Sequence, residues 1–122
     1  MPIGDIEPVR RLINATRNSL HGLGAGWREQ AALRYEFYVL AVLAPVGWYL
    51  GRSGVERALL IGSCLLVIVI ELVNSAVETV VDRIGREHHG LSGKAKDLAS
   101  AAVLAAIVNA AVVWMLIFLA QL

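Results

Sequence analysis

The stretch IELVNSAVETVVDRIGREHHGLSGKAKD, residues 70–97, begins inside a hydrophobic run that extends from residue 58 to residue 81. Five polar side chains follow one another at offsets of 3, 4, 7 and 11 from the first: Glu71, Asn74, Ser75, Glu78 and Asp82. On a helix these offsets place all five in one stripe about 100° wide, opposite a face made mostly of valine. Because a carboxylate in hydrocarbon is costly, the stripe indicates a functional site.

The composition is typical of a small membrane protein with one domain, over residues 1–122. Hydrophobic residues make up 57% of the 122 residues, and the mean hydropathy is +0.64. A net charge of +1 gives no electrostatic case for nucleic-acid binding. The single Cys64 lies in an apolar run and is expected to pack there. No cleavable signal peptide is expected, because the first 30 residues lack a continuous apolar segment.

Four helical segments are expected, one on the membrane surface and three across it. Residues 6–30 repeat apolar side chains at alternating spacings of 4 and 3, which is typical of a surface helix, although an ordinary soluble helix is the alternative. The predicted transmembrane helices cover residues 31–51, 58–81 and 98–120. Between them we expect a polar hairpin at residues 52–57 and a loop at residues 86–94. The three glycines of HGLGAGW, residues 21–27, predict a loosened turn.

The distribution of positive charge predicts the orientation of the chain. Nine of the eleven Lys and Arg residues lie in the N-terminal segment or in the second connection. We therefore expect the N-terminus and the second connection on the cytoplasmic side of the membrane and the C-terminus outside. In this orientation the stripe lies in the cytoplasmic half of the membrane, with Glu71 about 10 Å deeper than Glu78.

The stripe and the basic segment after it suit phosphoryl transfer from a soluble donor to a membrane acceptor. Carboxylates would hold the magnesium of a nucleotide, and Lys94 and Lys96 would contact phosphate. Glu71 would take a proton from a lipid hydroxyl as a general base. A non-enzymatic membrane protein with a polar network between helices is an alternative that spacing alone leaves open. Zinc is not expected at His88 and His89, because adjacent histidines point in different directions and no cysteine joins them.

Residues 70–104 closely resemble the signature of the prokaryotic diacylglycerol kinase family. Its pattern is E-x-x-N-[ST]-A-[IV]-E-x-x-[VI]-D, followed by a loop with a histidine, then A-K-D and a helix rich in small residues; all are present. The resemblance implies an all-α, homotrimeric membrane enzyme with a surface helix and three transmembrane helices per subunit, and sites shared between subunits. It implies transfer of the ATP γ-phosphate to diacylglycerol with Mg²⁺, giving phosphatidic acid. Undecaprenol, the substrate of relatives in the same superfamily, is the alternative acceptor.

The resemblance also implies roles for individual residues. Glu71 corresponds to the catalytic base and Glu78 to a magnesium ligand. The positions expected to bind nucleotide are Arg11, Asn18, Glu78, Glu87, His88, His89, Lys96 and Asp97. The positions expected to bind the lipid are Arg11, Ala15, Ser19, Glu36, Glu71, Asn74, Ser100 and Trp114. Asn18 stands where a tyrosine is common in the family.

One position departs from the family pattern. The family often has a second metal-binding glutamate in W-x-x-E-A-A, and the matching residue in WREQAA, residues 27–32, is Gln30. Gln30 would offer Mg²⁺ a neutral carbonyl oxygen. Alternatively Glu29, about 100° away around a helix, takes the role. Both arrangements predict a lower affinity for the metal.

Overall fold

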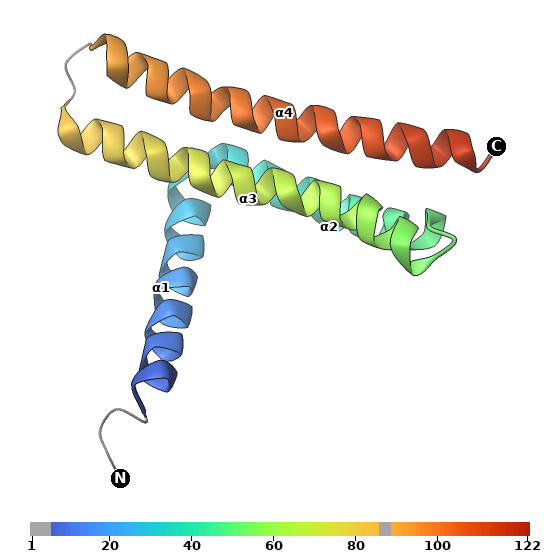
Figure 1. Ribbon diagram of the computed structural model, residues 1–122, viewed down its shortest axis with the longest axis horizontal. Helices are drawn as coiled ribbons and strands as arrows, with labels where there is room; N and C mark the ends of the chain where they lie inside the picture. The colour runs from blue at the N-terminus through green and yellow to red at the C-terminus, as the bar shows by residue number, and fades with distance from the viewer. Residues whose placement is uncertain (1–5, 86–88) are drawn as a thin grey trace. The chain divides into compact units, whose positions relative to one another are not determined.

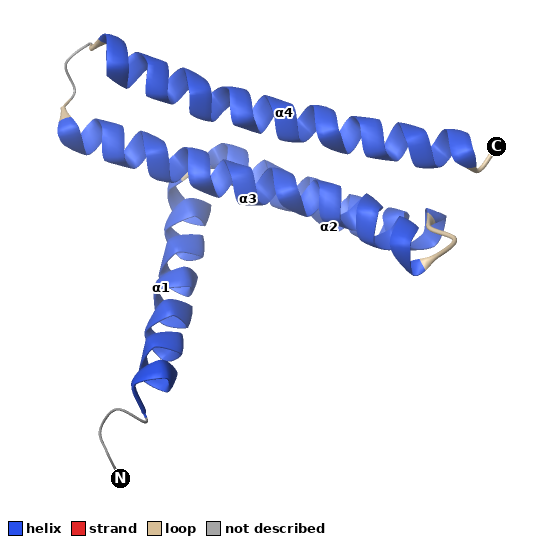
Figure 2. Ribbon diagram, viewed as in Figure 1, coloured by secondary structure: helices blue, strands red, loops and turns tan. Residues whose placement is uncertain are grey.

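The computed structural model describes residues 6–85 and 89–122, and these residues form four α-helices and no strand (Figures 1 and 2). The chain divides into two compact units, residues 1–31 and residues 32–122, and each is described by itself. The smaller unit contains α1 (Glu7–Glu29). The larger unit contains α2 (Ala31–Leu50), α3 (Gly54–Ile84) and α4 (Gly90–Ala120). The first residue of α2, Ala31, belongs to the smaller unit.

The helix that carries the polar stripe, α3, begins with a capping sequence. The hydroxyl of Ser53 accepts a hydrogen bond from the backbone N–H of Glu56 at 3.1 Å, and the Glu56 carboxylate accepts one from the backbone N–H of Arg52 at 2.6 Å. Ser and Glu three residues apart are a recognised signal for a helix start. The prediction of a hairpin over residues 52–57 was therefore wrong from Gly54 onward, where α3 has already begun.

The second long helix, α4, lies antiparallel alongside α3 (Figure 1). Its N-cap is His89, whose Nδ1 accepts a hydrogen bond from the backbone N–H of Leu91 at 3.0 Å. The helix begins at Gly90, so the predicted loop over residues 86–94 was wrong for residues 90–94. As a result Lys94 and Lys96 extend from a helix, which restricts the directions of their side chains.

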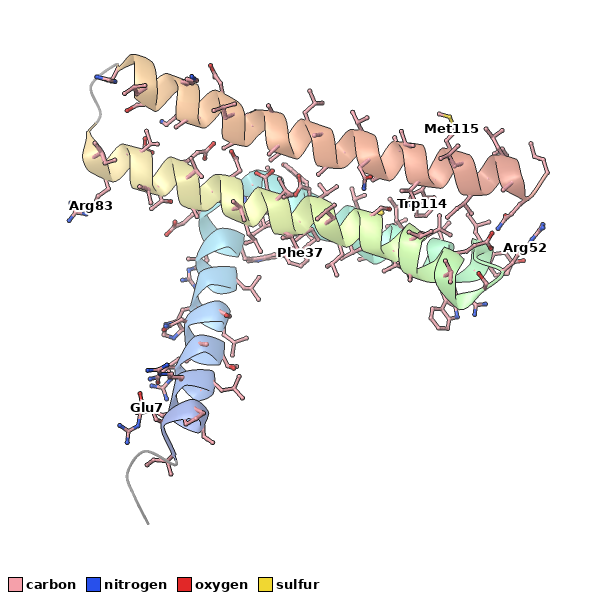
Figure 3. The ribbon with its side chains drawn as sticks, viewed as in Figure 1. Glu7, Phe37, Arg52, Arg83, Trp114 and Met115 are labelled. Carbon is pink, nitrogen blue, oxygen red and sulfur yellow. The ribbon has the colours of Figure 1, made fainter. Side chains whose placement is uncertain are left out.

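A glycine allows the three helices of the larger unit to approach one another. A Cβ atom on Gly47 of α2 would lie 3.2 Å from Leu60 Cβ on α3 and 3.5 Å from Trp114 Cζ2 on α4. The indole N–H of Trp114 donates a hydrogen bond to the Leu60 carbonyl at 3.0 Å. These contacts lie towards the end of the unit where α4 finishes, near Arg52 (Figure 3). They fix α2, α3 and α4 against each other at that end.

Polar side chains at the same end satisfy carbonyl groups that the end of α2 leaves open. The amide of Gln121 donates to the Leu50 carbonyl at 2.7 Å, and the guanidinium of Arg57 donates to the Trp48 carbonyl at 2.9 Å. Arg57 also lies over the ring of Trp48, 4.6 Å from its centroid. Free carbonyls at a helix C-terminus need such partners. None of these contacts was predicted from the sequence.

The smaller unit is one continuous amphipathic helix of 23 residues. The prediction of a loosened turn at residues 21–27 was wrong, because α1 passes through all three glycines. The helix instead ends at Glu29, and Gln30 follows in an extended conformation with its N–H bonded to the Gly26 carbonyl at 2.9 Å. Large apolar side chains are exposed along it, among them Val9, Ile13 and Leu20. This pattern agrees with a helix that lies on a membrane surface.

Two of the described helices, α3 and α4, are long and apolar enough to cross a membrane. The prediction of an all-α fold is therefore confirmed for the described residues, and α3 and α4 have the length and apolar character that a membrane crossing requires. The 20-residue α2 does not reach the same apolar character, because Arg34 and Glu36 interrupt its first half. The third crossing, over residues 31–51, stays a prediction.

Gly51, directly after α2, occupies a position with no room for a side chain. A Cβ atom there would meet Cγ of Arg57, the Arg57 backbone nitrogen at 3.0 Å and the Gly47 carbonyl oxygen at 3.1 Å. We expect Gly51→Ala to lower the free energy of unfolding by about 1–3 kcal/mol, the usual cost of overpacking. Gly62→Ala is the matched control, because a Cβ atom at Gly62 meets nothing within 4 Å. Melting temperatures in detergent micelles test this, and equal values for the two variants would contradict it.

Candidate functional site

The polar stripe lies on the face of α3 that is turned into the larger unit. Glu71 and Asn74 are only 6% and 8% exposed, in line with buried Ile68 and Val81. The opposite face is exposed at three valines: Val69, Val73 and Val80. Glu71 and Asn74 therefore share one face of α3, as their spacing predicts.

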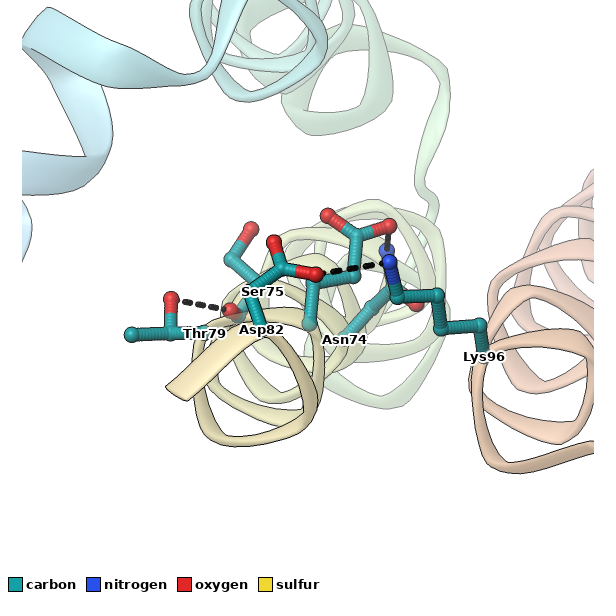
Figure 4. Close-up of polar contacts among 6 residues, drawn as sticks. Asn74, Ser75, Thr79, Asp82 and Lys96 are labelled. Atoms are coloured by element: carbon teal, nitrogen blue, oxygen red, sulfur yellow. Dashed lines mark hydrogen bonds and ion pairs between the residues drawn. The ribbon is translucent and has the colours of Figure 1, made fainter. Parts of the chain in front are cut away.

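Asn74 connects the buried part of the stripe to its more exposed end. Its Nδ2 donates a hydrogen bond to Glu78 Oε1 at 3.3 Å (Figure 4). Its Oδ1 is buried and has no hydrogen-bond partner within the described residues. A buried acceptor left unpaired costs about 1–3 kcal/mol. This oxygen therefore suits a donor or a cation from outside the described residues.

Glu71 faces a second carboxyl group, that of Glu36 on α2. The two groups are close enough for their charges to interact, and Glu36 Oε2 is buried without a partner in the described part of the chain. Two carboxylates at short range repel each other unless a proton or a cation comes between them. Glu36 also borders a groove of about 280 Å³ that is otherwise lined by apolar side chains of α2, α3 and α4. The pair thus combines a place for a proton with an apolar surface.

The last carboxylate of the stripe, Asp82, forms an ion pair with Lys96 of α4. Asp82 Oδ1 and Lys96 Nζ are 2.8 Å apart (Figure 4). Lys96 precedes the apolar segment 98–120, and its pKa is raised mainly by the hydrogen bond from its ammonium to Asp82 and by the charge of Asp82. Desolvation opposes this rise, and the charge of Glu78 adds a smaller contribution to it. The ammonium therefore stays positive at neutral pH beside two carboxylates. This pair was not predicted from the sequence, although opposite charges on both sides of the connection between the two helices are a signal for it.

Other predicted nucleotide-binding residues surround this ion pair in the sequence. Asp97 is exposed next to Lys96. His89 uses Nδ1 to cap α4, so in a neutral ring Nε2 carries the proton and acts as a donor. Two further predicted positions, Glu87 and His88, lie outside the described residues. The structure therefore pairs Lys96 with Asp82, one helical turn after Glu78, and Asp97 follows Lys96 directly in the chain.

Two predicted lipid-binding positions on α4 give a different picture. Ser100 is exposed. Trp114 contacts Leu60, which lies about 16 Å along α3 from Glu71 at the usual rise of a helix. The larger unit therefore does not bring Trp114 next to Glu71. A molecule that touches both has to be extended, as a lipid tail is.

The predicted positions in α1 are described within that unit alone. Arg11 Nε pairs with Glu7 Oε1 at 3.3 Å on the exposed surface. The hydroxyl of Ser19 donates to the carbonyl of Ala15 at 2.8 Å, and Asn18 is exposed. A weak exposed pair such as that of Arg11 contributes little to stability and leaves the guanidinium able to bind an anion.

The oxygen atoms of the stripe fit a magnesium ion that is bound partly by its nucleotide. No three His, Cys, Asp or Glu side chains gather as a metal-binding group in the part of the chain that the structure describes. Mg²⁺ commonly takes one or two carboxylates and completes its shell with water and phosphate oxygens. Glu78, with the unpaired oxygen of Asn74 nearby, supplies donors of this kind.

The two other candidate metal ligands, Glu29 and Gln30, lie where α1 ends. The prediction that one helix continues through both residues was wrong, because α1 ends at Glu29.

Comparisons with known proteins identify the family of this chain. The family model for prokaryotic diacylglycerol kinase matches residues 17–118. The chain is 48% identical to a diacylglycerol kinase of Haemophilus influenzae over 106 residues, which are 87% of this chain and 90% of the relative. It is 46% identical to that of Escherichia coli K12 over 85% of each chain, and 45% identical to that of Pseudomonas aeruginosa over 91% and 90%. The chain therefore belongs to the prokaryotic diacylglycerol kinase family and is a lipid kinase.

Proposed function

We propose that this protein transfers the γ-phosphate of ATP to the hydroxyl group of diacylglycerol and releases phosphatidic acid and ADP. The observation that carries the proposal is the carboxylate of Glu71, 6% exposed on the inner face of a helix apolar enough to cross a membrane. Carboxylates in such helices are rare and usually functional. The stripe leads from Glu71 through Asn74 and Glu78 to the Asp82–Lys96 pair, as a lipid site joined to a phosphate site requires.

The chemistry assigned to this site is a single displacement at phosphorus. The lipid hydroxyl oxygen forms a bond to the γ-phosphorus while the bond to the oxygen bridging to the β-phosphate breaks, and that oxygen leaves with ADP. Glu71 accepts the hydroxyl proton as a general base. Glu36, whose charge interacts with that of Glu71, would help to hold Glu71 towards the lipid hydroxyl. Asn74 uses its unpaired Oδ1 to accept a hydrogen bond from the substrate or to bind the metal.

The nucleotide is assigned to the more exposed end of the stripe. Glu78 would hold Mg²⁺ together with Glu29, the last residue of α1, or with Gln30, which follows it. The ion neutralises phosphate charge when it is bound. Lys96 donates hydrogen bonds to phosphate oxygens. The other residues that the family resemblance assigns to the nucleotide are Arg11, Asn18, Glu87, His88, His89 and Asp97. Those that it assigns to the lipid are Arg11, Ala15, Ser19, Ser100 and Trp114.

We also propose that three copies of the chain assemble in a bacterial inner membrane, with the N-terminus cytoplasmic and residues 31–51 as the third crossing. Two observations support a partner. The long apolar helix α4 has Ala106 as its single buried residue, so most of its surface is available to lipid or to another helix. The buried oxygen of Asn74 lacks a donor among the described residues of its own protomer. Sites shared between subunits would account for both.

The test is transfer of label from radioactive ATP to a lipid in detergent micelles. Diacylglycerol and undecaprenol are supplied side by side, and triacylglycerol, which has no free hydroxyl, is the negative control. We expect magnesium-dependent labelling of diacylglycerol. Preferential labelling of undecaprenol would replace the proposed acceptor, and absence of label from every lipid would overturn the proposed reaction.

The glutamine at position 30 makes the metal dependence of this chain testable. If Gln30 is a weaker replacement for a carboxylate, Gln30→Glu should lower the magnesium concentration that gives half the maximal rate. If Glu29 has the role, Glu29→Gln is the damaging change and Gln30→Ala is mild. Magnesium titrations of the three variants at saturating ATP decide between them. Indifference to all three changes would show that the end of α1 supplies no metal ligand.

A further inference from the structure

The ion pair between Asp82 and Lys96 joins two helices across the connection that begins at Gly85. It links the last turn of α3 to the second turn of α4, with 2.8 Å between the charged atoms. The side chains are 60% and 44% exposed. A contact this exposed adds little to the stability of the fold. Its position beside the proposed phosphate site indicates that the ion pair acts on nucleotide binding instead.

Asp82 determines which side of α3 the Lys96 ammonium occupies. Asp82 comes one helical turn after Glu78, so the two carboxylates share a face, and the charge of Glu78 acts on the same ammonium. A free lysine side chain samples many rotamers, and ordering it costs up to about 2 kcal/mol. An ammonium already held beside Glu78 has lost part of that freedom before a nucleotide binds.

We propose that Asp82 is a positioning residue for the nucleotide site: it holds the Lys96 ammonium beside Glu78 so that the ammonium meets the phosphate carried by the metal. The proposal rests on the proposed function, which assigns phosphate to Lys96 and metal to Glu78. An ammonium has three N–H donors, and Asp82 uses one of them. Lys96 can therefore keep its bond to Asp82 while it donates to phosphate oxygens.

The first measurement is equilibrium binding of MgATP to the full-length protein in micelles without lipid. We expect Asp82→Asn to raise the Kd by about two- to fivefold, the range that an exposed ion pair supplies. Asp82→Glu retains the carboxylate and should stay closer to the wild type. Glu56→Gln, a carboxylate change at the opposite end of α3, is the matched control and should leave the Kd unchanged. An unchanged or lower Kd for Asp82→Asn would overturn the proposal, and a lower value would mean that Asp82 competes with phosphate.

A double-mutant cycle separates positioning from a structural role. In a Lys96→Met background, Asp82→Asn should add no further loss of MgATP affinity. An equal loss in both backgrounds would show that Asp82 does not act through Lys96. In the kinase assay the KM for ATP should rise while the KM for lipid stays constant; a matched rise in both would indicate a general loss of structure and overturn the proposal. Because MgATP binding is measured without lipid, failure of lipid phosphorylation would contradict the proposed function and leave this test intact.

Discussion

Replacing Glu71 with glutamine is expected to lower lipid turnover by about 10²-fold or more, as removal of a general base usually does. Glutamine keeps the size of the side chain and its hydrogen-bonding capacity, but it cannot take the proton of the lipid hydroxyl. The fold should survive, because a neutral amide is less costly than a carboxylate at a position that is 6% exposed.

The measurement is the rate of lipid phosphorylation at saturating ATP and lipid, with MgATP affinity and oligomer size as controls. Both controls should match the wild type. Glu56→Gln tests whether loss of any carboxylate from α3 is harmful, and it should be nearly neutral. A near wild-type rate for Glu71→Gln would make Glu71 a structural residue, and Asp97 would be the next candidate for the base.

Glu78→Gln is expected to abolish most activity through a different step. The amide oxygen of glutamine can still accept the hydrogen bond that Asn74 donates at 3.3 Å, so the local structure is preserved. The loss of charge weakens the hold on magnesium, which prefers carboxylate oxygens. The magnesium concentration that gives half the maximal rate should therefore be higher than in the wild type.

High magnesium should restore part of the activity of Glu78→Gln and none of that of Glu71→Gln. Magnesium titrations of both variants, with MgATP binding measured in parallel, separate the two roles. Unchanged activity together with an unchanged magnesium requirement would remove Glu78 from the metal site.

The side of α3 that carries the site was predictable because it depends on a local rule. Spacings of 3 and 4 between Glu71, Asn74 and Glu78 place them together on any helix, and the structure buries that side. The electrostatic interaction of Glu71 with Glu36 was not predictable in this way, because it depends on how α2 is rotated against α3.

The errors in the helix boundaries have physical causes. Glycine and polar residues predict loops at residues 52–57 and 86–94. Ser53 and Glu56 instead cap α3, and the His89 side chain caps α4, so both helices begin earlier than composition suggested. In α1 the three glycines cost about 1 kcal/mol each as helix residues, yet none of them ends the helix.

The indole ring of Trp114, whose N–H donates a hydrogen bond to the Leu60 carbonyl, is an internal fluorophore of the protein. Of the three tryptophans, Trp27 and Trp48 are 40% and 61% exposed, whereas Trp114 is partly enclosed where α4 meets α3. Indole emission shifts in wavelength when the polarity around the ring or the bonding of its N–H changes. With phenylalanine at the other two positions, the emission of Trp114 would follow the separation of α3 and α4 in real time, far from the reacting phosphate and without an attached dye.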